Sequence, residues 1–199
     1  MGNDFVVLRE DDPRREDVES LGYTVVGESW GARLELADAP DLSIFRGALS
    51  RVEHAGIKIF ELPVTASSDL YELERANTAD YPFTPATSHD LLDTEATRDL
   101  WNKGFRVFGA RDGELLVGAT VIARREKHAE TEFTSVLATH RGSGIGAAVK
   151  AASIIACAND GARVFGTGGA AANEASLGVN RALGYNITER WYSYKAPLA

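Results

Sequence analysis

The chain has 199 residues, of which 44% are hydrophobic and 25% are charged, a composition typical of a globular protein with one full core. Its formal net charge of −8 argues against nucleic acid as a partner and slightly favours a cationic or amine ligand. The single cysteine, Cys157, excludes a disulfide within one chain, which suits the cytoplasm. We expect Cys157 to be a small packing residue rather than a nucleophile.

No segment is expected to direct the chain to a membrane. Residues 1–4 lack the basic region that begins a secretory signal, and no apolar h-region follows them. No apolar run is long enough to cross a bilayer. We therefore expect a cytoplasmic protein without a membrane partner, either a monomer or a homodimer.

The first 56 residues are expected to form an α/β extension. Its expected elements are a strand over residues 5–9, a helix over 14–21, a strand over 23–36 and a helix over 44–55. Leu21-Gly22-Tyr23 is similar to Leu183-Gly184-Tyr185, and a tryptophan follows each triplet. We interpret residues 1–56 either as the remnant back half of a second copy of the following unit or as a chance likeness. Residues 57–199 form the main domain, and the absence of a low-complexity linker favours one packed body.

From residue 57 onward, strands and helices follow an order that predicts a mixed α/β (α+β) sheet with helices on both faces. The expected strands cover residues 57–62, 105–111, 114–124, 131–137, 163–167 and 186–195, and the expected helices cover residues 67–79, 91–101, 144–159 and 173–183. Residues 81–85 are expected to form an aromatic loop held by two prolines, and residues 124–129 a polar loop.

The most informative stretch of the chain runs from residue 131 to residue 150. Gly142, Gly144 and Gly146 lie where the expected strand passes into the expected helix. A helix start offers unpaired N–H groups and the positive end of a dipole, and glycines let a ligand approach that backbone. The stretch is therefore expected to bind a phosphate group.

Several interpretations of this stretch compete. A nucleoside-triphosphate loop requires Gly-Lys-Ser/Thr, but two alanines follow Gly146. The looser dinucleotide pattern is satisfied from Gly142 to Ala147, but the next expected strand ends in Gly168-Gly169 instead of a ribose-binding acid. A tight strand-to-helix turn without a ligand is the remaining alternative, against which three glycines and an arginine coincide at the helix start.

Arg141-Gly-Ser-Gly-Ile-Gly146 closely resembles the acetyl-CoA-binding motif of the GCN5-related N-acetyltransferases (GNAT superfamily), Arg/Gln-x-x-Gly-x-Gly/Ala. Residues 173–185 are similar to the fourth-helix pattern of the same family, which begins with Asn and ends in Leu-Gly-Phe/Tyr. The resemblance covers residues 57–199 and implies the GNAT fold, with a sheet that splays at the glycine loop.

The resemblance also implies an activity. It is the transfer of an acetyl group from acetyl-CoA, as co-substrate and without a metal, to a primary amine of a small molecule. Acetylation of a protein or peptide and a non-catalytic acyl-CoA-binding module are the two alternatives.

The resemblance assigns most of the cofactor contacts. Backbone N–H groups of Val136 and Leu137 would bind the thioester carbonyl. The pyrophosphate would lie on the loop formed by Arg141, Gly142, Ser143, Gly144, Ile145 and Gly146, with Arg141 adding charge.

Two asparagines extend the expected cofactor site. Asn173 and Asn180 are seven residues apart, so a helix places them on one face, where they would bind the pantetheine arm and the pyrophosphate end. Four residues are expected to form a separate apolar face: Ala175, Val179, Ala182 and Leu183. The alternative is that Asn173 only caps the helix and that Asn180 is solvated.

The attacking amine must lose a proton, and Glu132 is the expected base, directly or through water. Strand alternation predicts that Glu130, Glu132 and Thr134 share the face of Val136. The alternative is that Glu132 is an ordinary solvent-facing glutamate.

The departing CoA thiolate can take a proton from a general acid. Many family members carry a helix tyrosine as this acid at the position of Asn180, and an asparagine cannot act as an acid. Tyr192 is therefore the candidate acid, and Tyr194 is a second tyrosine on the same strand; both also suit packing. The acceptor pocket implied by the fold involves Tyr81, Phe83, Trp191 and Tyr192.

Overall fold

The computed structural model describes residues 5–82, 84–87 and 90–197. Its eight-stranded mixed sheet has the order β1-β8-β2-β7-β6-β5-β4-β3. The strands are β1 (Phe5–Arg9), β2 (Thr24–Glu35), β3 (Lys58–Glu61), β4 (Arg106–Asp112), β5 (Leu115–Arg125), β6 (His128–Val136), β7 (Val164–Ala170) and β8 (Asn186–Lys195). The α-helices are α1 (Arg14–Ser20), α2 (Ser43–Glu53), α3 (Ser67–Asn77), α4 (Thr94–Asn102), α5 (Ile145–Asn159) and α6 (Glu174–Ala182). The predicted mixed α/β fold is confirmed.

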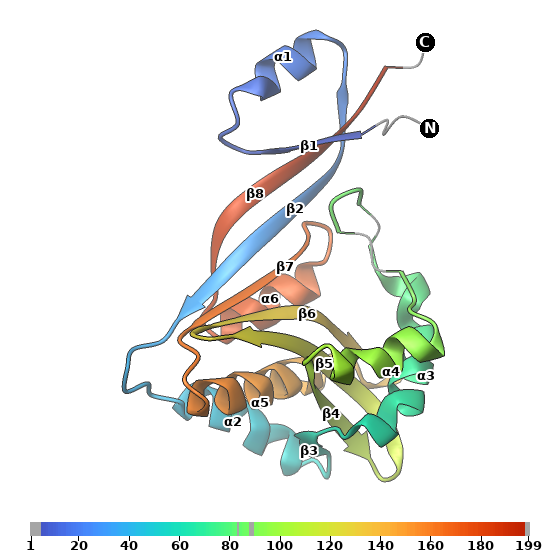
Figure 1. Cartoon of the computed structure of the whole chain (residues 1–199), viewed down its shortest axis with the longest axis vertical. Helices are drawn as coiled ribbons and strands as arrows, with labels where there is room; N and C mark the ends of the chain where they lie inside the picture. Colours follow the sequence, from blue (N-terminus) through green and yellow to red (C-terminus); the bar gives the residue numbers. More distant parts are fainter. Residues whose placement is uncertain (1–4, 83, 88–89, 198–199) are drawn as a thin grey trace.

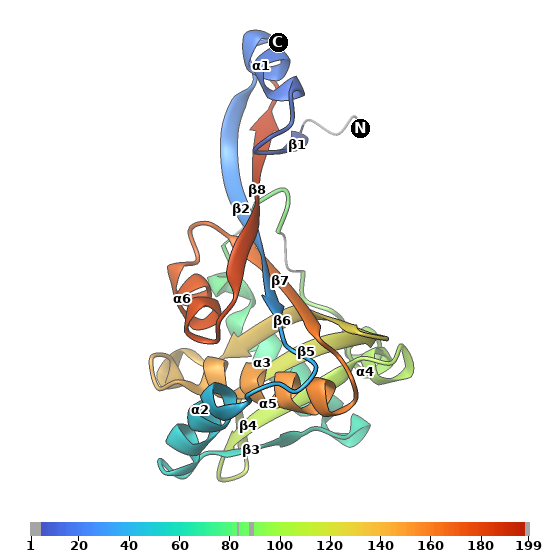
Figure 2. The same cartoon turned by 90° about the vertical axis from the view of Figure 1, so that its left-hand side faces the viewer.

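The molecule has a compact body and a projecting arm (Figure 1). In the body, α2 and α5 cover one face of the sheet, while α3 and α4 cover the other. The arm consists of α1, β1 and the outer parts of β2 and β8, and it stands away from the body in both views (Figures 1 and 2). The sheet therefore continues from the body into the arm through β2 and β8.

The N-terminal extension is part of this sheet. Strand β2 lies between β7 and β8 and pairs antiparallel with both of them. Strand β1 pairs with the outer part of β8, so the N-terminal segment flanks the last strand on two sides. The extension thus supplies the strand that connects β8 to the rest of the sheet. Its origin as a remnant of a second unit stays an interpretation.

Strands β6 and β7 form the one parallel pair among the described strands, and their pairing is short. It joins residues 128–130 of β6 to residues 164–166 of β7, beyond which no further pairs form. Strand β7 continues through Gly168 and Gly169, which pair with β2, so the expected end at Thr167 was wrong. A Cβ on Gly169 would lie 3.0 Å from the Trp30 ring, which explains why a strand tolerates glycine here.

A β-bulge interrupts β6 next to the point where the strands separate. Val121 of β5 pairs with Phe133, and Ile122 pairs with Thr131, so Glu132 is an extra residue in β6. The alternation of side chains therefore changes face at Glu132. This corrects the expectation that Glu130 and Val136 share a face. The expectation of a polar loop over residues 124–129 was also wrong. Because β5 extends to Arg125 and β6 begins at His128, only a two-residue turn lies between them.

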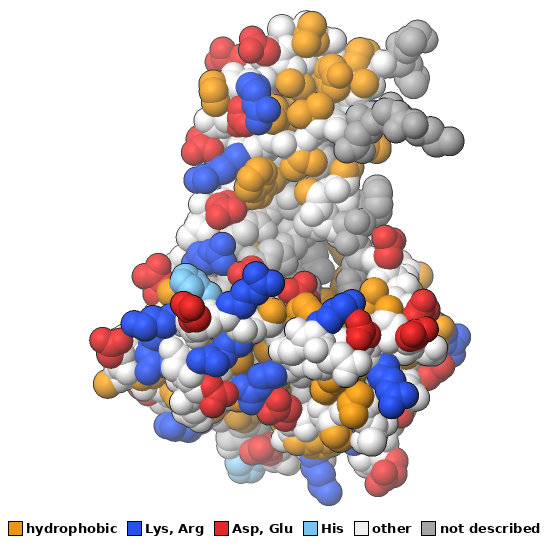
Figure 3. Space-filling model, viewed as in Figure 1, with side chains coloured by type: hydrophobic (Ala, Val, Ile, Leu, Met, Phe, Trp, Pro, Cys, Tyr) orange, Lys and Arg blue, Asp and Glu red, His pale blue; other side chains and the backbone are white. Residues whose placement is uncertain are grey.

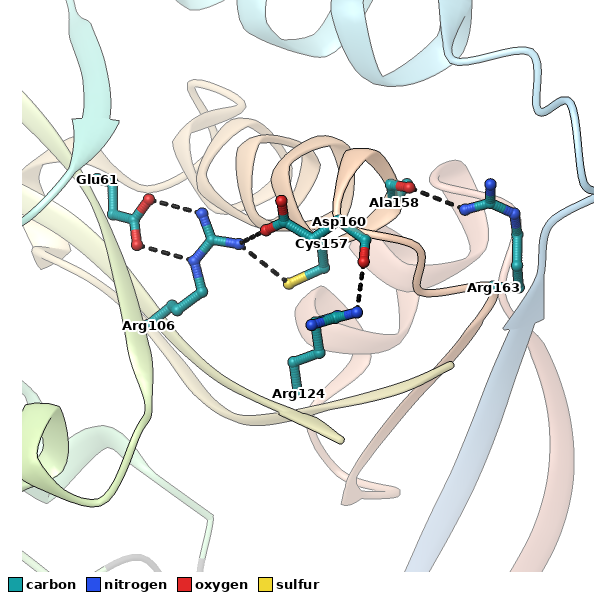
Figure 4. A network of polar contacts seen from close by, with 7 residues as sticks. All are labelled: Glu61, Arg106, Arg124, Cys157, Ala158, Asp160 and Arg163. Atoms are coloured by element: carbon teal, nitrogen blue, oxygen red, sulfur yellow. Dashed lines mark hydrogen bonds and ion pairs between the residues drawn. The ribbon is translucent and has the colours of Figure 1, made fainter. Parts of the chain in front are cut away.

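Three arginines hold the C-terminal end of α5 (Figure 4). The Arg106 guanidinium binds both carboxylate oxygens of Glu61 over 2.8 and 2.7 Å and Asp160 over 2.7 Å. Arg124 donates to the Asp160 carbonyl, and Arg163 donates to the Ala158 carbonyl over 2.8 Å. Positive charge at this end complements the helix dipole and fixes α5 in place.

Cys157 lies inside this network, where it is buried. Burial raises the pKa of its thiol, although the Arg106 guanidinium acts in the opposite direction. The residue therefore has the environment of a packing residue, as expected from the sequence.

A first prediction concerns the close approach of α5 to the sheet. A Cβ added to Gly118 of β5 would lie 2.5 Å from Ile145 Cγ2. We expect Gly118→Ala to lower the free energy of unfolding by about 1–3 kcal/mol in urea denaturation, because overpacking displaces the start of α5. The control Gly47→Ala in α2 meets nothing within 4 Å and should raise that free energy by about 0.5–1 kcal/mol. Equal stability of the two variants would contradict this packing.

Candidate functional site

A cavity of about 980 Å³ opens where β6 and β7 separate. Its walls come from the diverging strands, the loop before α5, the first two turns of α5, the start of α6 and the end of α3. Its lining includes Tyr81, Thr131, Glu132, Thr134, Val136, Arg141, Gly142, Gly144, Ile145, Gly146, Lys150, Thr167, Asn173 and Trp191.

The glycine loop lines this cavity at the start of α5. Gly142 and Gly144 have φ angles of +76° and +88°, which favour glycine, and α5 begins at Ile145. The first helical hydrogen bond runs from Ala148 N–H to the Gly144 carbonyl over 3.0 Å. The N–H groups of Ile145, Gly146 and Ala147 therefore lack helical acceptors, as at any helix start. A Cβ on Gly142 would meet nothing within 4 Å, so a ligand can approach there.

The predicted loop residues are largely brought together. Gly142, Gly144, Ile145 and Gly146 all line the cavity. Ser143 does not line it, and its hydroxyl donates to the His140 carbonyl. The structure thus places the start of α5 and its unpaired N–H groups at the cavity wall.

Arg141 also lines the cavity, but its guanidinium is bonded to groups of the protein. Its Nε donates to the Val136 carbonyl over 3.1 Å, and Nη2 binds Asn77 Oδ1 over 3.0 Å and Asp80 over 2.7 Å. Asn77 in turn donates to Ser135 Oγ over 2.8 Å. The guanidinium therefore connects β6 to α3, and its charge is already paired with Asp80. Because the bonds hold it there, Arg141 positions the strand and loop.

The two N–H groups expected at the thioester differ in availability. Leu137 N–H donates to the Val117 carbonyl on β5 over 2.9 Å, and Leu137 does not line the cavity. In an antiparallel ladder successive N–H groups point to opposite sides, so that of Val136 points away from β5. It therefore faces the open side toward β7, and Val136 lines the cavity. Of the two N–H groups, only that of Val136 is therefore available to a carbonyl oxygen in the cavity.

Glu132 lines the cavity at the bulge of β6. Partial burial raises the pKa of its carboxyl, and the nearby Glu130 carboxylate raises it further, while Arg125 lowers it. A base with a raised pKa accepts a proton more readily from an attacking amine. Glu132 and Val136 both line the cavity, so the structure keeps the expected base close to the expected carbonyl-binding strand end.

The aromatic wall is only partly the expected one. Tyr81 and Trp191 line the cavity, and Tyr81 Oη donates to the Thr134 carbonyl over 3.4 Å. Burial raises the pKa of Tyr81, so this phenol keeps its proton near neutral pH. Trp191 Nε1 donates to Glu189 over 3.2 Å. Phe83 lies outside the described residues.

Tyr192 does not lie at the cavity. Its ring packs against the Arg15 guanidinium, 4.1 Å from the ring centroid, on the side of the sheet covered by α1. Tyr194 is fully buried there, with its hydroxyl bonded to Arg15 Nε over 2.8 Å and to Glu19 over 2.7 Å. The expected role of Tyr192 as an acid therefore finds no geometric support. The reason is that the N-terminal α1 occupies this face of β8.

The two asparagines do not share a face. Asn173 precedes α6 as its N-cap, accepts from Ser176 N–H over 3.0 Å and lines the cavity. Asn180 is only 1% exposed, donates to the Ser176 carbonyl over 2.9 Å and does not line the cavity. Ala175 and Val179, expected on a separate apolar face, line the cavity instead. Asn173 thus caps α6 and also lines the cavity, so its contact with a cofactor stays a prediction. Asn180 is buried, so the alternative that it is solvated was wrong, and no contact of Asn180 with a ligand is supported.

Lys150 is a cavity residue that the sequence pattern did not indicate. It lies on α5, is 3% exposed and lines the cavity, with Nζ donating to Thr167 Oγ1 over 3.1 Å. Burial lowers the pKa of its amine to about 7, although Glu130 raises it slightly. The only signal was a lysine among small apolar residues of a buried helix, a pattern that a solvated lysine also gives.

The described part of the chain contains no group of three or more His, Cys, Asp or Glu side chains placed to hold a metal ion. Among the same residues, no helix has the length and apolar character needed to span a bilayer.

Comparison with known proteins gives one family match. The model of the acetyltransferase (GNAT) family matches residues 68–185. No curated protein sequence matches the chain.

Several solved structures share the fold at low sequence identity. A GCN5-related N-acetyltransferase from Sphaerobacter thermophilus has a TM-score of 0.70 at 17% identity, over 96% of this chain and 58% of the other. One from Kribbella flavida has a TM-score of 0.61 at 17% identity, over 98% and 68%. The structure of yncA from Salmonella typhimurium with its cofactor acetyl-CoA has a TM-score of 0.57 at 15% identity, over 72% and 95%.

Proposed function

Since the chain belongs to the acetyltransferase (GNAT) family, we propose that it transfers an acetyl group from acetyl-CoA to a primary amine of a small molecule. One observation carries the proposal. A single cavity joins the helix start at Gly144 to the unpaired edge of β6 at Val136 and to Glu132. Phosphate binding, carbonyl binding and proton acceptance therefore have a candidate group in the same cavity.

Acetyl-CoA binding would begin at the glycine loop. The pyrophosphate would accept hydrogen bonds from the N–H groups of Ile145, Gly146 and Ala147, supported by the dipole of α5. The pantetheine arm would follow the edge of β6 where β7 has separated. The acetyl-CoA in the yncA structure supports this proposal through the shared fold.

Residues that line this cavity can assist each step of the acetyl transfer. The neutral amine nitrogen attacks the thioester carbon, a C–N bond forms, and the negative charge on the carbonyl oxygen is stabilised by Val136 N–H. The C–S bond then breaks and CoA leaves as a thiolate, while the proton of the amine passes to Glu132. The products are the amide and CoA.

Protonation of the thiolate needs no dedicated acid. By analogy with cysteine, a CoA thiol has a pKa of about 8–9, so its thiolate leaves readily near neutral pH and takes a proton from solvent. The Tyr81 phenol holds its proton more strongly than such a thiol. Its role in this proposal is to donate a hydrogen bond and to form part of the wall.

The acceptor amine would enter between the aromatic side chains of Tyr81, Trp30 and Trp191, which line the cavity. Aromatic rings attract an ammonium group, which loses one proton to solvent before the neutral amine attacks. The test is an array of small amines and an array of peptides, each assayed for CoA release from acetyl-CoA. Turnover confined to small amines supports the proposal, whereas turnover confined to peptides contradicts it. Tight CoA binding without turnover on either array would indicate a non-catalytic module.

A further inference from the structure

The closed end of the cavity is built around a buried amine. Strands β6 and β7 are last paired at Glu130 and Gly166, and the next residues, Thr131 and Thr167, line the cavity where the strands separate. Lys150 reaches this point from α5 and is only 3% exposed, although it lines the cavity. Its Nζ donates to Thr167 Oγ1 over 3.1 Å, which leaves two of its three N–H donors.

No carboxylate in the described part of the chain lies within 4 Å of this amine. The contacts of Lys150 Nζ are the Thr167 hydroxyl and the ring of Tyr185, whose centroid lies 5.3 Å away. Glu130 acts on it only from a longer distance, and the Glu130 carboxylate binds Arg33 over 2.8 Å. A buried ammonium without an anionic partner is costly, and here burial favours the neutral amine.

A carboxylate is the group that would complete this end of the cavity. It would supply the missing negative charge and accept charge-assisted hydrogen bonds from the ammonium. The Thr167 hydroxyl, which accepts from Lys150, and the Thr131 hydroxyl, which also lines the cavity, can donate to the same group. An apolar acyl methyl group would leave these donors unmatched.

We propose that Lys150 anchors a carboxylate subsite at the closed end of the cavity, and that one of the two reactants carries a carboxylate there. The inference rests on the proposed function, because the cavity must first bind an acyl-CoA. The carboxylate has two sources. It belongs to the acyl chain of the donor, as in malonyl-CoA or succinyl-CoA, or to an amino acid that serves as the acceptor.

The donor arm of the test is calorimetric titration of acetyl-CoA, malonyl-CoA and succinyl-CoA. Parent protein, Lys150→Met and the exposed control Lys58→Met are compared. If the donor carries the carboxylate, the parent and Lys58→Met bind one dicarboxylic acyl-CoA at least tenfold more tightly than acetyl-CoA. Lys150→Met loses this preference.

The acceptor arm uses acetyl-CoA as the donor and compares amino acids with their carboxamides. If the acceptor carries the carboxylate, Lys150→Met raises KM at least tenfold for the amino acids and not for the amides. Lys58→Met leaves both values unchanged.

A bound carboxylate also has a signature that does not depend on turnover. It raises the pKa of the amine, so at pH 8 the parent takes up protons on binding the carboxylate-bearing ligand, and titrations in two buffers of different ionisation enthalpy detect this uptake. Lys150→Met shows none. Uptake that persists in Lys150→Met overturns the assignment.

Thermal denaturation tests the buried amine itself. A lysine with a pKa of about 7 in the folded state and 10.5 in the unfolded state destabilises the fold below pH 7. This destabilisation disappears as the pH rises toward 10.5. Lys150→Met should therefore raise Tm more at pH 7 than at pH 10, and an equal gain at both values contradicts the buried amine.

Failure of the carboxylate subsite can be distinguished from failure of the acetyltransferase function. If the parent binds and turns over acetyl-CoA but neither arm depends on Lys150, the carboxylate subsite is overturned and the acetyltransferase function stands. If the parent binds no acyl-CoA at all, the proposed function fails first. The parent protein's own preferences among donors and acceptors remain informative even if Lys150→Met does not fold.

Discussion

Replacement of Gly144 by Asp is expected to weaken acetyl-CoA binding by at least about a hundredfold. Gly144 lines the cavity and precedes the first residue of α5, whose first N–H groups have no helical acceptor. An aspartate adds bulk and negative charge beside the pyrophosphate. The loss of two charge-assisted hydrogen bonds, each worth about 1.5–3 kcal/mol, corresponds to this factor or more. Calorimetric titration measures the change.

The control for this variant is Gly104→Asp. Gly104 has a φ of +83°, close to the +88° of Gly144, but lies after α4 and does not line the cavity. Both variants therefore carry a similar backbone strain, while only one meets the ligand. A Cβ on Gly144 meets only Val52 Cγ1, at 3.6 Å, so we expect Gly144→Asp to fold. Equal acetyl-CoA affinity in folded Gly144→Asp and Gly104→Asp would refute phosphate binding at the loop.

Replacement of Glu132 by Gln is expected to lower kcat by at least about a hundredfold, within the range that general bases contribute. The amide keeps the size of the side chain but cannot accept the proton of the amine. Affinity for acetyl-CoA should change little, because the glycine loop and Val136 are unaltered. Steady-state kinetics together with calorimetric titration separate the two effects. The control Glu114→Gln, in the exposed turn between β4 and β5, should retain parent activity.

The pH dependence gives a second test of Glu132. Its pKa is raised by partial burial first and by Glu130 second, so the carboxylate loses its proton at a higher pH than an ordinary glutamate. Activity of the parent should rise with pH through this pKa, because only the ionised form accepts a proton. The acid limb should be absent from the residual activity of Glu132→Gln. An unchanged acid limb would assign the proton transfer to another group.

The glycine loop was predictable because its signals are local. Gly142 and Gly144 must adopt positive φ, and the strand before them and the helix after them have different hydrophobic periods. The order of the elements from residue 57 onward was predictable for the same reason. Element ends were less certain, as shown by α4, which begins at Thr94 after Asp93 caps it through Ala96 N–H over 2.7 Å.

The arrangement of the terminal strands was not predictable from local pattern. The insertion of β2 between β7 and β8 depends on pairing between residues more than a hundred positions apart, and no spacing within either segment specifies it. The same contact explains Tyr192. Its ring faces α1 and Arg15 because the N-terminal extension covers this face of the sheet.

The chemistry of the site depended on two features that a residue pattern does not show. The bulge at Glu132 alters which β6 side chains share a face, because it adds one residue opposite β5. The burial of Lys150 follows from packing of α5 beneath the junction of β6 and β7. A sequence shows the lysine, whereas only the tertiary structure shows that it lies in the cavity.

A crystal structure of the protein with acetyl-CoA is the most direct test of the claim that the cavity between β6 and β7 binds the acetyl donor. We predict the pyrophosphate within hydrogen-bond distance of the N–H groups of Ile145 and Gly146. We also predict the thioester carbonyl beside Val136 N–H, and Glu132 on the side from which the amine attacks. Acetyl-CoA bound away from the Gly142–Gly146 loop, with this cavity empty, would contradict the claim.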